Sequence, residues 1–227
     1  MRKMSAILIV FLLVVISCSN TVQGDNFGDF GNDNEPEIAK KQLLFESAKI
    51  SDIGMQAAKD MLELAFFENV TEADVARAIE KAMIDSDSSE YIEAFGVLVM
   101  SGEESALPHG DPSNDETDLI SVGEVVVVDL GARYRGYCTD LTRTFFMGPP
   151  TEEMMEVYNI TLEAHGAGIK AVRAGELARD VDKAARDVIS SYGYGENFTH
   201  GLGHGIGVYI HMPLFGTVTH RGRAVYR

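Results

Sequence analysis

Apolar residues recur at helical spacing in the stretch that begins near residue 38. Between Ile38 and Phe67 the apolar stripe consists of Leu43, Leu44, Ala48, Ile53, Ala57, Met61 and Leu64. Residues three or four apart share one face of a helix, so this stretch predicts a helix with one buried side. A second stripe contains Val75, Ile79 and Met83. Thr71, with Asp74 three residues later, approximates a capping box at the start of this second helix.

The middle of the chain changes from helical to strand-like patterning. Residues 95–100 form a short apolar run, and residues 124–129 contain four consecutive valines. Short apolar runs bounded by turn residues are typical of buried strands. The segment 136–147 is the expected hairpin partner of the valine run, and Gly148 with the two prolines after it ends that partner strand.

Two further helices are expected after the hairpin. Thr151 is placed to cap the first, with Glu152 and Glu153 near the positive end of the helix dipole. The second helix spans about 177–191, and a glycine-dense segment then leads into an expected strand at 208–211. This order of elements predicts an α+β fold in which helices cover one face of a mostly antiparallel sheet.

Two aspartates on the expected hairpin are the first candidates for chemistry. Asp129 follows the valine run, where an unpaired charge would be costly. A hairpin that folds about Tyr134 and Arg135 would place Asp140 directly opposite Asp129. Directly opposed residues have Cβ atoms about 4.5–5.5 Å apart. Two bare carboxylates so close repel each other, so the spacing predicts a cation between them.

A histidine in the glycine-dense segment is the third candidate. His204 lies within GLGHGIG, residues 201–207, where glycines let the backbone approach a crowded centre. Carboxylates together with imidazole suit Mn, Co, Zn or Fe ions. A dinucleotide-binding interpretation fails, because its sixth position is Ile206 and a strand is expected next. Cys138 shares a strand face with Asp140 and is either a further ligand or, as we favour, a small buried hydrophobe.

Charge and the N-terminal residues limit the partners and the compartment. The net charge of −16 argues against nucleic acid, which requires clustered Lys and Arg. Residues 1–24, with basic residues before an apolar run, indicate a secretory signal and hence an exported protein of the cell envelope or the extracellular space. Cys18 is either a lipidated residue that anchors the protein on a membrane or part of a plain, removed signal peptide. Residues 25–37 predict a flexible acidic spacer.

Three separated motifs occur in a fixed order along the chain. They are SALPHGDPS, VVVVDLGARYRGYCTDLTRTFFMG and HGLGHGIGVYIHMP. Together they resemble the pita-bread metallopeptidases, the family of methionine aminopeptidase, Xaa-Pro aminopeptidase, prolidase and creatinase. The stretch DLTRTF is more similar to the Xaa-Pro branch. The resemblance covers residues 38–213 and implies a pita-bread catalytic domain there.

The resemblance also implies a site and a reaction. The site would hold two divalent ions, Mn or Co ahead of Zn or Fe, on the ligands Asp129, Asp140 and His204. Its substrate-facing or site-adjacent histidines would be His109, His200 and His211. The implied reaction is hydrolysis of the N-terminal Xaa-Pro bond of peptides that have proline second. We therefore expect a metal-dependent exopeptidase.

The chain departs from that family after His211. The family site also uses two glutamates downstream, whereas the sixteen residues after His211 contain no Asp or Glu. The segment 214–227 is basic and unlike the family, which predicts a truncated or frame-shifted chain with an incomplete fold. We expect such a chain to bind at most one ion tightly and to be weak or inactive as a peptidase. The alternative is a non-catalytic peptide-binding module. An exposed sheet edge would favour association, so a homodimer stays open.

Overall fold

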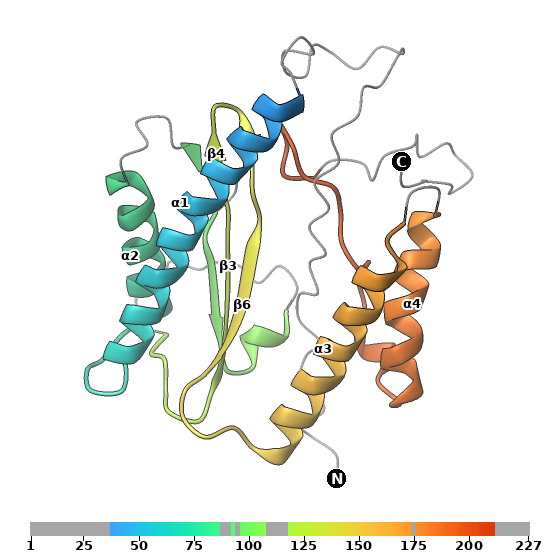
Figure 1. Ribbon diagram of the computed structural model, residues 1–227. Coiled ribbons are helices and arrows are strands. Elements are labelled where there is room, and N and C mark those ends of the chain that lie inside the picture. Colours follow the sequence, from blue (N-terminus) through green and yellow to red (C-terminus); the bar gives the residue numbers. More distant parts are fainter. Residues whose placement is uncertain (1–36, 87–91, 94–95, 108–117, 174–175, 212–227) are drawn as a thin grey trace.

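The computed structural model describes residues 37–86, 92–93, 96–107, 118–173 and 176–211 (Figure 1). Its helices are α1 (Glu37–Leu64), α2 (Glu72–Asp85), α3 (Glu152–Ala171) and α4 (Ala178–Ser191), with 3₁₀ turns η1 (Glu104–Ala106) and η2 (Gly195–Asn197). Its strands are β1 (Ile92–Glu93), β2 (Leu98–Ser101), β3 (Val125–Leu130), β4 (Ala132–Tyr134), β5 (Tyr137–Cys138) and β6 (Leu141–Phe146). No helix among these residues is both long and apolar enough to cross a lipid bilayer.

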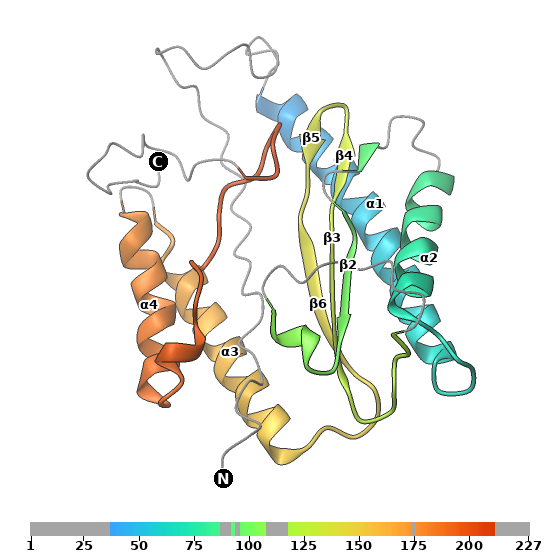
Figure 2. The ribbon, with the colours of Figure 1, turned by 180° about the vertical axis from the view of Figure 1, so that it is seen from behind.

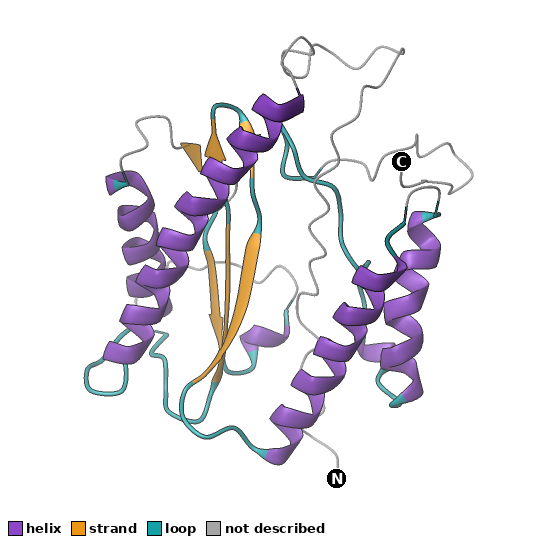
Figure 3. Ribbon diagram, viewed as in Figure 1, coloured by secondary structure: helices purple, strands orange, loops and turns teal. Residues whose placement is uncertain are grey.

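The strands form two antiparallel sheets, in the orders β1-β4-β5 and β2-β3-β6. One long hairpin runs through both, because β3 continues into β4 and β5 returns into β6 (Figure 3). Helices α1 and α2 pack on each other and lie along the sheets, α1 against β3, β4 and β5 and α2 against β2 (Figure 1). The expected α+β arrangement of helices on an antiparallel sheet is confirmed.

The valine run is buried on both faces, as its continuous apolar sequence requires. Val126, Val128 and Leu130 belong to the main core, which α1 and α2 complete. Val127 points the other way and packs with Met100 of β2. Side chains alternate between the two faces of a strand, so Asp129 shares the face of Val127, away from α1 and α2.

Helices α3 and α4 form a second unit beside the sheet (Figure 2). Their shared core also includes side chains of the segment after α4, and it consists of Val157, Ile160, Ala164, Val181, Ala185, Ile189, Phe198 and Leu202. The Thr151 side chain accepts a hydrogen bond from the Met154 amide, so the expected cap of α3 is confirmed. The capping box of Thr71 and Asp74 at the start of α2 is also confirmed.

The hairpin register differs from the one the sequence suggested. The central turn residues are Arg135 and Gly136, with φ of 46° and 85°, and not Tyr134 and Arg135. A tight two-residue turn of this kind needs positive φ at both positions, which a glycine adopts without strain. Asp129 is therefore opposite Thr142, so the prediction that it lies opposite Asp140 was wrong. The shift is two residues, and a shift of two keeps every side chain on its expected face.

The strand expected at 208–211 is also absent. Residues 207–211 form successive bends, and the chain there is fixed by isolated contacts with β5. The glycines that suggested a tight approach in the preceding segment thus lead into irregular backbone. Residues 198–211, which we call the return segment, contain no regular strand.

Candidate metal site

Asp129 is a buried carboxylate near the end of β3. Its exposed fraction is 4%. The hydroxyl of Thr142, its partner across the β3–β6 ladder, donates to Oδ1 of Asp129 at 2.7 Å. A buried carboxylate needs such donors, because burial away from water is otherwise costly. The corrected register therefore supplies Asp129 with a fixed hydrogen bond.

Asp140 lies where the returning strand is interrupted between β5 and β6. The preceding residue, Thr139, is anchored to α1, since its hydroxyl lies 3.1 Å from that of Ser47 and 2.9 Å from that of Ser51. Both serines also bond the backbone of Ala132, Ser47 to its carbonyl and Ser51 to its amide. This buried polar network fixes the position of the backbone that carries Asp140.

The carboxyl group of Asp140 is buried in an environment that disfavours its charge. Its side chain is 4% exposed. Burial raises the pKa of Asp140 from 3.8 to about 6, and a hydrogen bond with the Asp129 side chain opposes the rise. Oδ1 of Asp140 is buried and meets no hydrogen-bonding group among the described residues. The side chains of the two aspartates thus interact, although they are not directly opposed and Asp140 lies just outside the β3–β6 ladder.

His204 reaches Asp140 from the return segment. Its Nε2 lies 3.4 Å from Oδ2 of Asp140, and its side chain is 23% exposed. Its Nδ1 lies 3.1 Å from the carbonyl oxygen of Gly205, which can accept a hydrogen bond only if Nδ1 carries the proton. A neutral ring in that tautomer turns the lone pair of Nε2 towards Asp140. Asp140 thus contacts both of the other predicted ligands, but Asp129, Asp140 and His204 do not bring one ligand atom each within 4.8 Å of the others.

The other predicted histidines occupy different positions around His204. The His211 ring is exposed and lies 4.4 Å from that of His204, measured between centroids. His200 places Nδ1 2.8 Å from the carbonyl oxygen of Gly201, and its ring packs edge-on against Phe198. His109 lies outside the described residues. Of the three, His211 is thus the one seen beside the predicted ligands.

Cys138 is a buried thiol between the hairpin and the return segment. Its exposed fraction is 0%. Its amide donates to the carbonyl oxygen of Gly207 at 2.6 Å. Its Sγ lies 3.7 Å from the carbonyl oxygen of Val208 and accepts a hydrogen bond from Nε of Arg133 at 3.3 Å. These contacts favour the interpretation of Cys138 as a small buried residue that joins two segments.

These donors fit a divalent cation. Oδ2 of Asp140 and the Nε2 lone pair of His204 are both electron-rich and close to each other, and Oδ1 of Asp140 has no described partner. Such groups repel unless a proton or a cation lies between them. Carboxylate oxygens with a neutral imidazole suit the divalent first-row ions named above.

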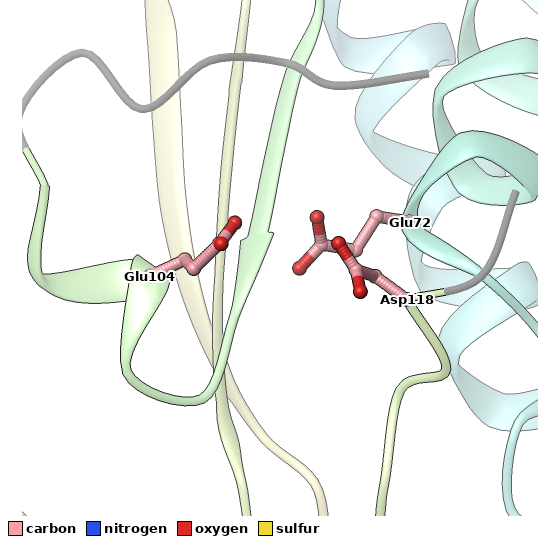
Figure 4. Close-up of side chains that lie close together, drawn as sticks. All are labelled: Glu72, Glu104 and Asp118. Atoms are coloured by element: carbon pink, nitrogen blue, oxygen red, sulfur yellow. The ribbon is translucent and has the colours of Figure 1, made fainter. Parts of the chain in front are cut away.

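A second acidic cluster lies apart from these ligands. Glu72, Glu104 and Asp118 bring one oxygen each within 4.8 Å of the others (Figure 4). Glu72 is buried, and Oε1 accepts the amide hydrogen of Ser101 at 2.5 Å. Ser101 pairs with Val126, whereas Asp129 pairs with Leu98 at the other end of the β2–β3 ladder. No sequence motif pointed to this cluster, because its members come from α2, η1 and the segment before β3, which are far apart in the sequence.

Comparison with known proteins decides the family. The sequence profile described as metallopeptidase family M24 matches residues 42–225. The chain belongs to this family. An uncharacterized peptidase of Staphylococcus haemolyticus is 41% identical over 178 residues, which are 78% of this chain and 47% of that protein. The Xaa-Pro dipeptidase of Pyrococcus furiosus is 38% identical over 170 residues, 75% of this chain and 46% of that protein.

Solved M24 structures show the same architecture. Prolidase from Pyrococcus furiosus superposes with a TM-score of 0.73 at 34% identity, over 83% of this chain and 53% of that one. X-Pro aminopeptidase from Thermotoga maritima gives 0.72 at 32% identity, over 84% of this chain and 51% of that one. The chain therefore has part of the pita-bread fold and is related to the Xaa-Pro peptidases. It spans about half the length of these M24 relatives.

Proposed function

We propose that this M24 chain acts on the N-terminal Xaa-Pro bond of peptides through divalent ions held by Asp129, Asp140 and His204. The observation that carries the proposal is that Nε2 of His204 lies 3.4 Å from Oδ2 of the buried Asp140, whose side chain also interacts with that of Asp129. Relatives named Xaa-Pro dipeptidase and prolidase support the substrate class. When bound, divalent ions supply Lewis-acid polarisation of a peptide carbonyl.

The chain's own residues would prepare the site in three ways. Thr142 holds the Asp129 carboxylate in place, and the Gly205 carbonyl favours the His204 tautomer that leaves Nε2 available. His211 stands exposed beside His204, where it can contact a peptide arriving from solvent. We assign His109 and His200 substrate-side roles on the motif resemblance alone.

Charge balance is the reason to expect impaired turnover in this polypeptide. Two divalent ions carry four positive charges, whereas Asp129 and Asp140 together supply two negative ones and a neutral His204 none. Residues 212–227 of this polypeptide contain no Asp or Glu that could make up the difference. We expect one ion to bind more tightly than a second, and hydrolysis to be slow compared with a full-length relative.

The same lack of further acidic metal ligands favours one alternative, a peptide-binding module without turnover. Both candidates predict that peptides with proline second bind near His211, so binding alone does not separate them. Product release separates them, because only the peptidase produces a free N-terminal residue. The two can thus be decided with one purified protein.

The test combines metal binding with turnover. The 227-residue chain is titrated with Mn²⁺ and Co²⁺ by calorimetry, beside Asp140→Asn as the matched variant. It is then incubated with Ala-Pro and, as a control, Ala-Ala. Saturable metal binding that Asp140→Asn abolishes, with slow release of alanine from Ala-Pro only, supports the peptidase. Binding of Ala-Pro without product supports the module, and absence of metal binding in the parent chain contradicts the peptidase.

We also propose export, with Cys18 as a lipid anchor. The support is the basic and apolar pattern of residues 1–24. In cells that process bacterial lipoproteins, the full chain should fractionate with membranes and Cys18→Ala should not. Identical fractionation of both proteins would refute the anchor.

A further inference from the structure

The return segment is held by a side-chain pair on α4 that none of the motifs includes. Asp182 and Arg186 lie one turn apart on α4 and form a two-point ion pair, Nε to Oδ2 at 3.0 Å and Nη2 to Oδ1 at 3.2 Å. Their side chains are 29% and 35% exposed, so the pair is largely covered. It lies where α4 faces residues 198–202.

Both members of the pair also bond the backbone of the return segment. Arg186 donates from Nη1 to the carbonyl of Phe198 at 2.7 Å and from Nη2 to that of His200 at 2.8 Å. Asp182 accepts the amide hydrogen of Leu202 at Oδ1, at 2.8 Å. Every second residue from 198 to 202 is thus tied to α4, in the way that a neighbouring strand would tie it.

The guanidinium group has a third kind of contact with this segment. It lies over the ring of Phe198, 4.2 Å from the ring centroid, which is within range for a cation–π interaction. Phe198 and Leu202 are themselves buried in the core of α3 and α4. The planar fork of arginine satisfies the ion pair and both carbonyls at once, which a lysine ammonium on one flexible stem cannot do.

We propose that Asp182 and Arg186 are a positioning pair that fixes the return segment so that His204 reaches Asp140. His204 follows Leu202 by two residues, and Gly207 beyond it is held by the Cys138 amide. The histidine therefore lies between two anchored points. Displacement of a ligand by a fraction of an ångström weakens a metal site, so the upstream anchor sets metal affinity. The metal part of this inference rests on the proposed function.

The test uses three variants of the full chain. Arg186→Lys keeps the charge but loses the fork, Arg186→Met loses both, and Lys183→Met is the control. Lys183 forms an ion pair with Asp187 on the same helix at the same spacing, with side chains 66% and 63% exposed. Circular dichroism and urea unfolding establish that each variant is folded. Co²⁺ titration by visible absorption measures the site.

We expect both Arg186 variants to bind Co²⁺ about 10–100-fold more weakly than the parent, the usual cost of losing support for a ligand. The Lys183→Met control should stay within about twofold of the parent, since an exposed pair contributes little. Equal affinity in the parent and Arg186→Met would overturn the proposal. Full recovery in Arg186→Lys would also overturn it, because charge alone would then suffice.

A measurement on metal-free protein separates this inference from the proposed function. Hydrogen exchange of the Leu202 amide and the ring resonances of His204 are compared by NMR in the parent and Arg186→Lys. Faster exchange and shifted ring resonances in Arg186→Lys support the anchor, even if the parent binds no Co²⁺ and the peptidase proposal fails. Unchanged exchange and resonances would refute the anchor, even if the parent binds Co²⁺ well.

Discussion

The two sides of the candidate site are held in place by different means. Asp129 and Asp140 lie on a hairpin whose backbone is paired in a sheet and whose other face is covered by α1 and α2. His204 lies on the return segment, where side chains of α4 and the amide of Cys138 supply the contacts. One side is built into the main core, and the other is packed on and hydrogen-bonded to the unit of α3 and α4, with a further bond to Cys138.

This difference separates stability from ligand placement. Changes under the hairpin should lower the stability of the whole domain, because they disturb a cooperative core. Changes in the anchors of the return segment should move His204 while leaving that core intact. The comparison is useful because the two responses are measured separately, by unfolding and by metal titration.

Asp140→Asn should have the largest effect, and it should act in opposite directions on the two properties. Loss of the carboxylate that contacts both Asp129 and His204 should weaken Mn²⁺ affinity about 100-fold or more. Residues that only support a metal ligand typically contribute about 10–100-fold to affinity, and loss of a ligand itself should cost at least the upper value. In metal-free protein the same change should raise stability near neutral pH. Calorimetric titration and urea unfolding in EDTA check the two halves.

The direction of the stability change follows from the raised pKa of Asp140, about 6 in the folded state against 3.8. A carboxyl group whose pKa is higher in the folded than in the unfolded state makes the protein less stable as pH rises from below the unfolded-state pKa to above the folded-state pKa. The gain in Asp140→Asn should therefore reach roughly 1–3 kcal/mol above about pH 6.5 and vanish near pH 4. Asp60→Asn, on the exposed side of α1, is the control. A destabilised variant in EDTA would contradict this account of the buried carboxyl.

The hairpin side was largely predictable from the sequence. The valine run, the capping box at Thr71 and the existence of the hairpin that carries both aspartates all follow from local patterns. The register was off by two residues because the pattern does not say which residues adopt positive φ, and Arg135 is an unusual choice for that conformation. A shift of two preserves the faces, so Asp129 and Asp140 keep a common face, although the spacing argument from direct opposition does not hold.

The return segment was not predictable in the same way. Its glycines indicated a close backbone approach around His204, but the strand predicted at 208–211 was wrong. No sequence pattern indicated that side chains of α4 hold this segment. Asp182 and Arg186 form an ion pair at a common helical spacing, the same spacing as that of Lys183 and Asp187 one residue further on. Ser47 and Ser51 also look ordinary on a helix, although both are buried against Ala132 and Thr139. Only tertiary contacts distinguish such pairs.

Ser51→Ala should give the second-largest effect and fall on the hairpin side alone. The Ser51 hydroxyl serves the Ala132 amide and the Thr139 hydroxyl, both buried. Loss of a partner for buried polar groups costs about 1–2 kcal/mol of unfolding free energy. Urea unfolding measures it, with Ser191→Ala as the control, since that hydroxyl is exposed at the end of α4. Equal stability of the two variants would show that the network contributes little.

Glu72→Gln should give the smallest effect and shows whether a buried acid alone marks a metal site. Burial raises the pKa of Glu72, and the nearby Glu104 and Asp118 add to the rise. Its ionisation therefore costs stability as pH rises above the unfolded value, so Gln, which can still accept from the Ser101 amide, should raise the melting temperature near pH 7.5 and not near pH 4. Metal affinity should not change, in contrast to Asp140→Asn. Exposed Glu68→Gln is the control. If Glu72→Gln weakened Mn²⁺ binding as well, the end of the β2–β3 ladder far from Asp129 would belong to the metal site. The contrast between the hairpin and the return segment would then not be sufficient to explain metal binding.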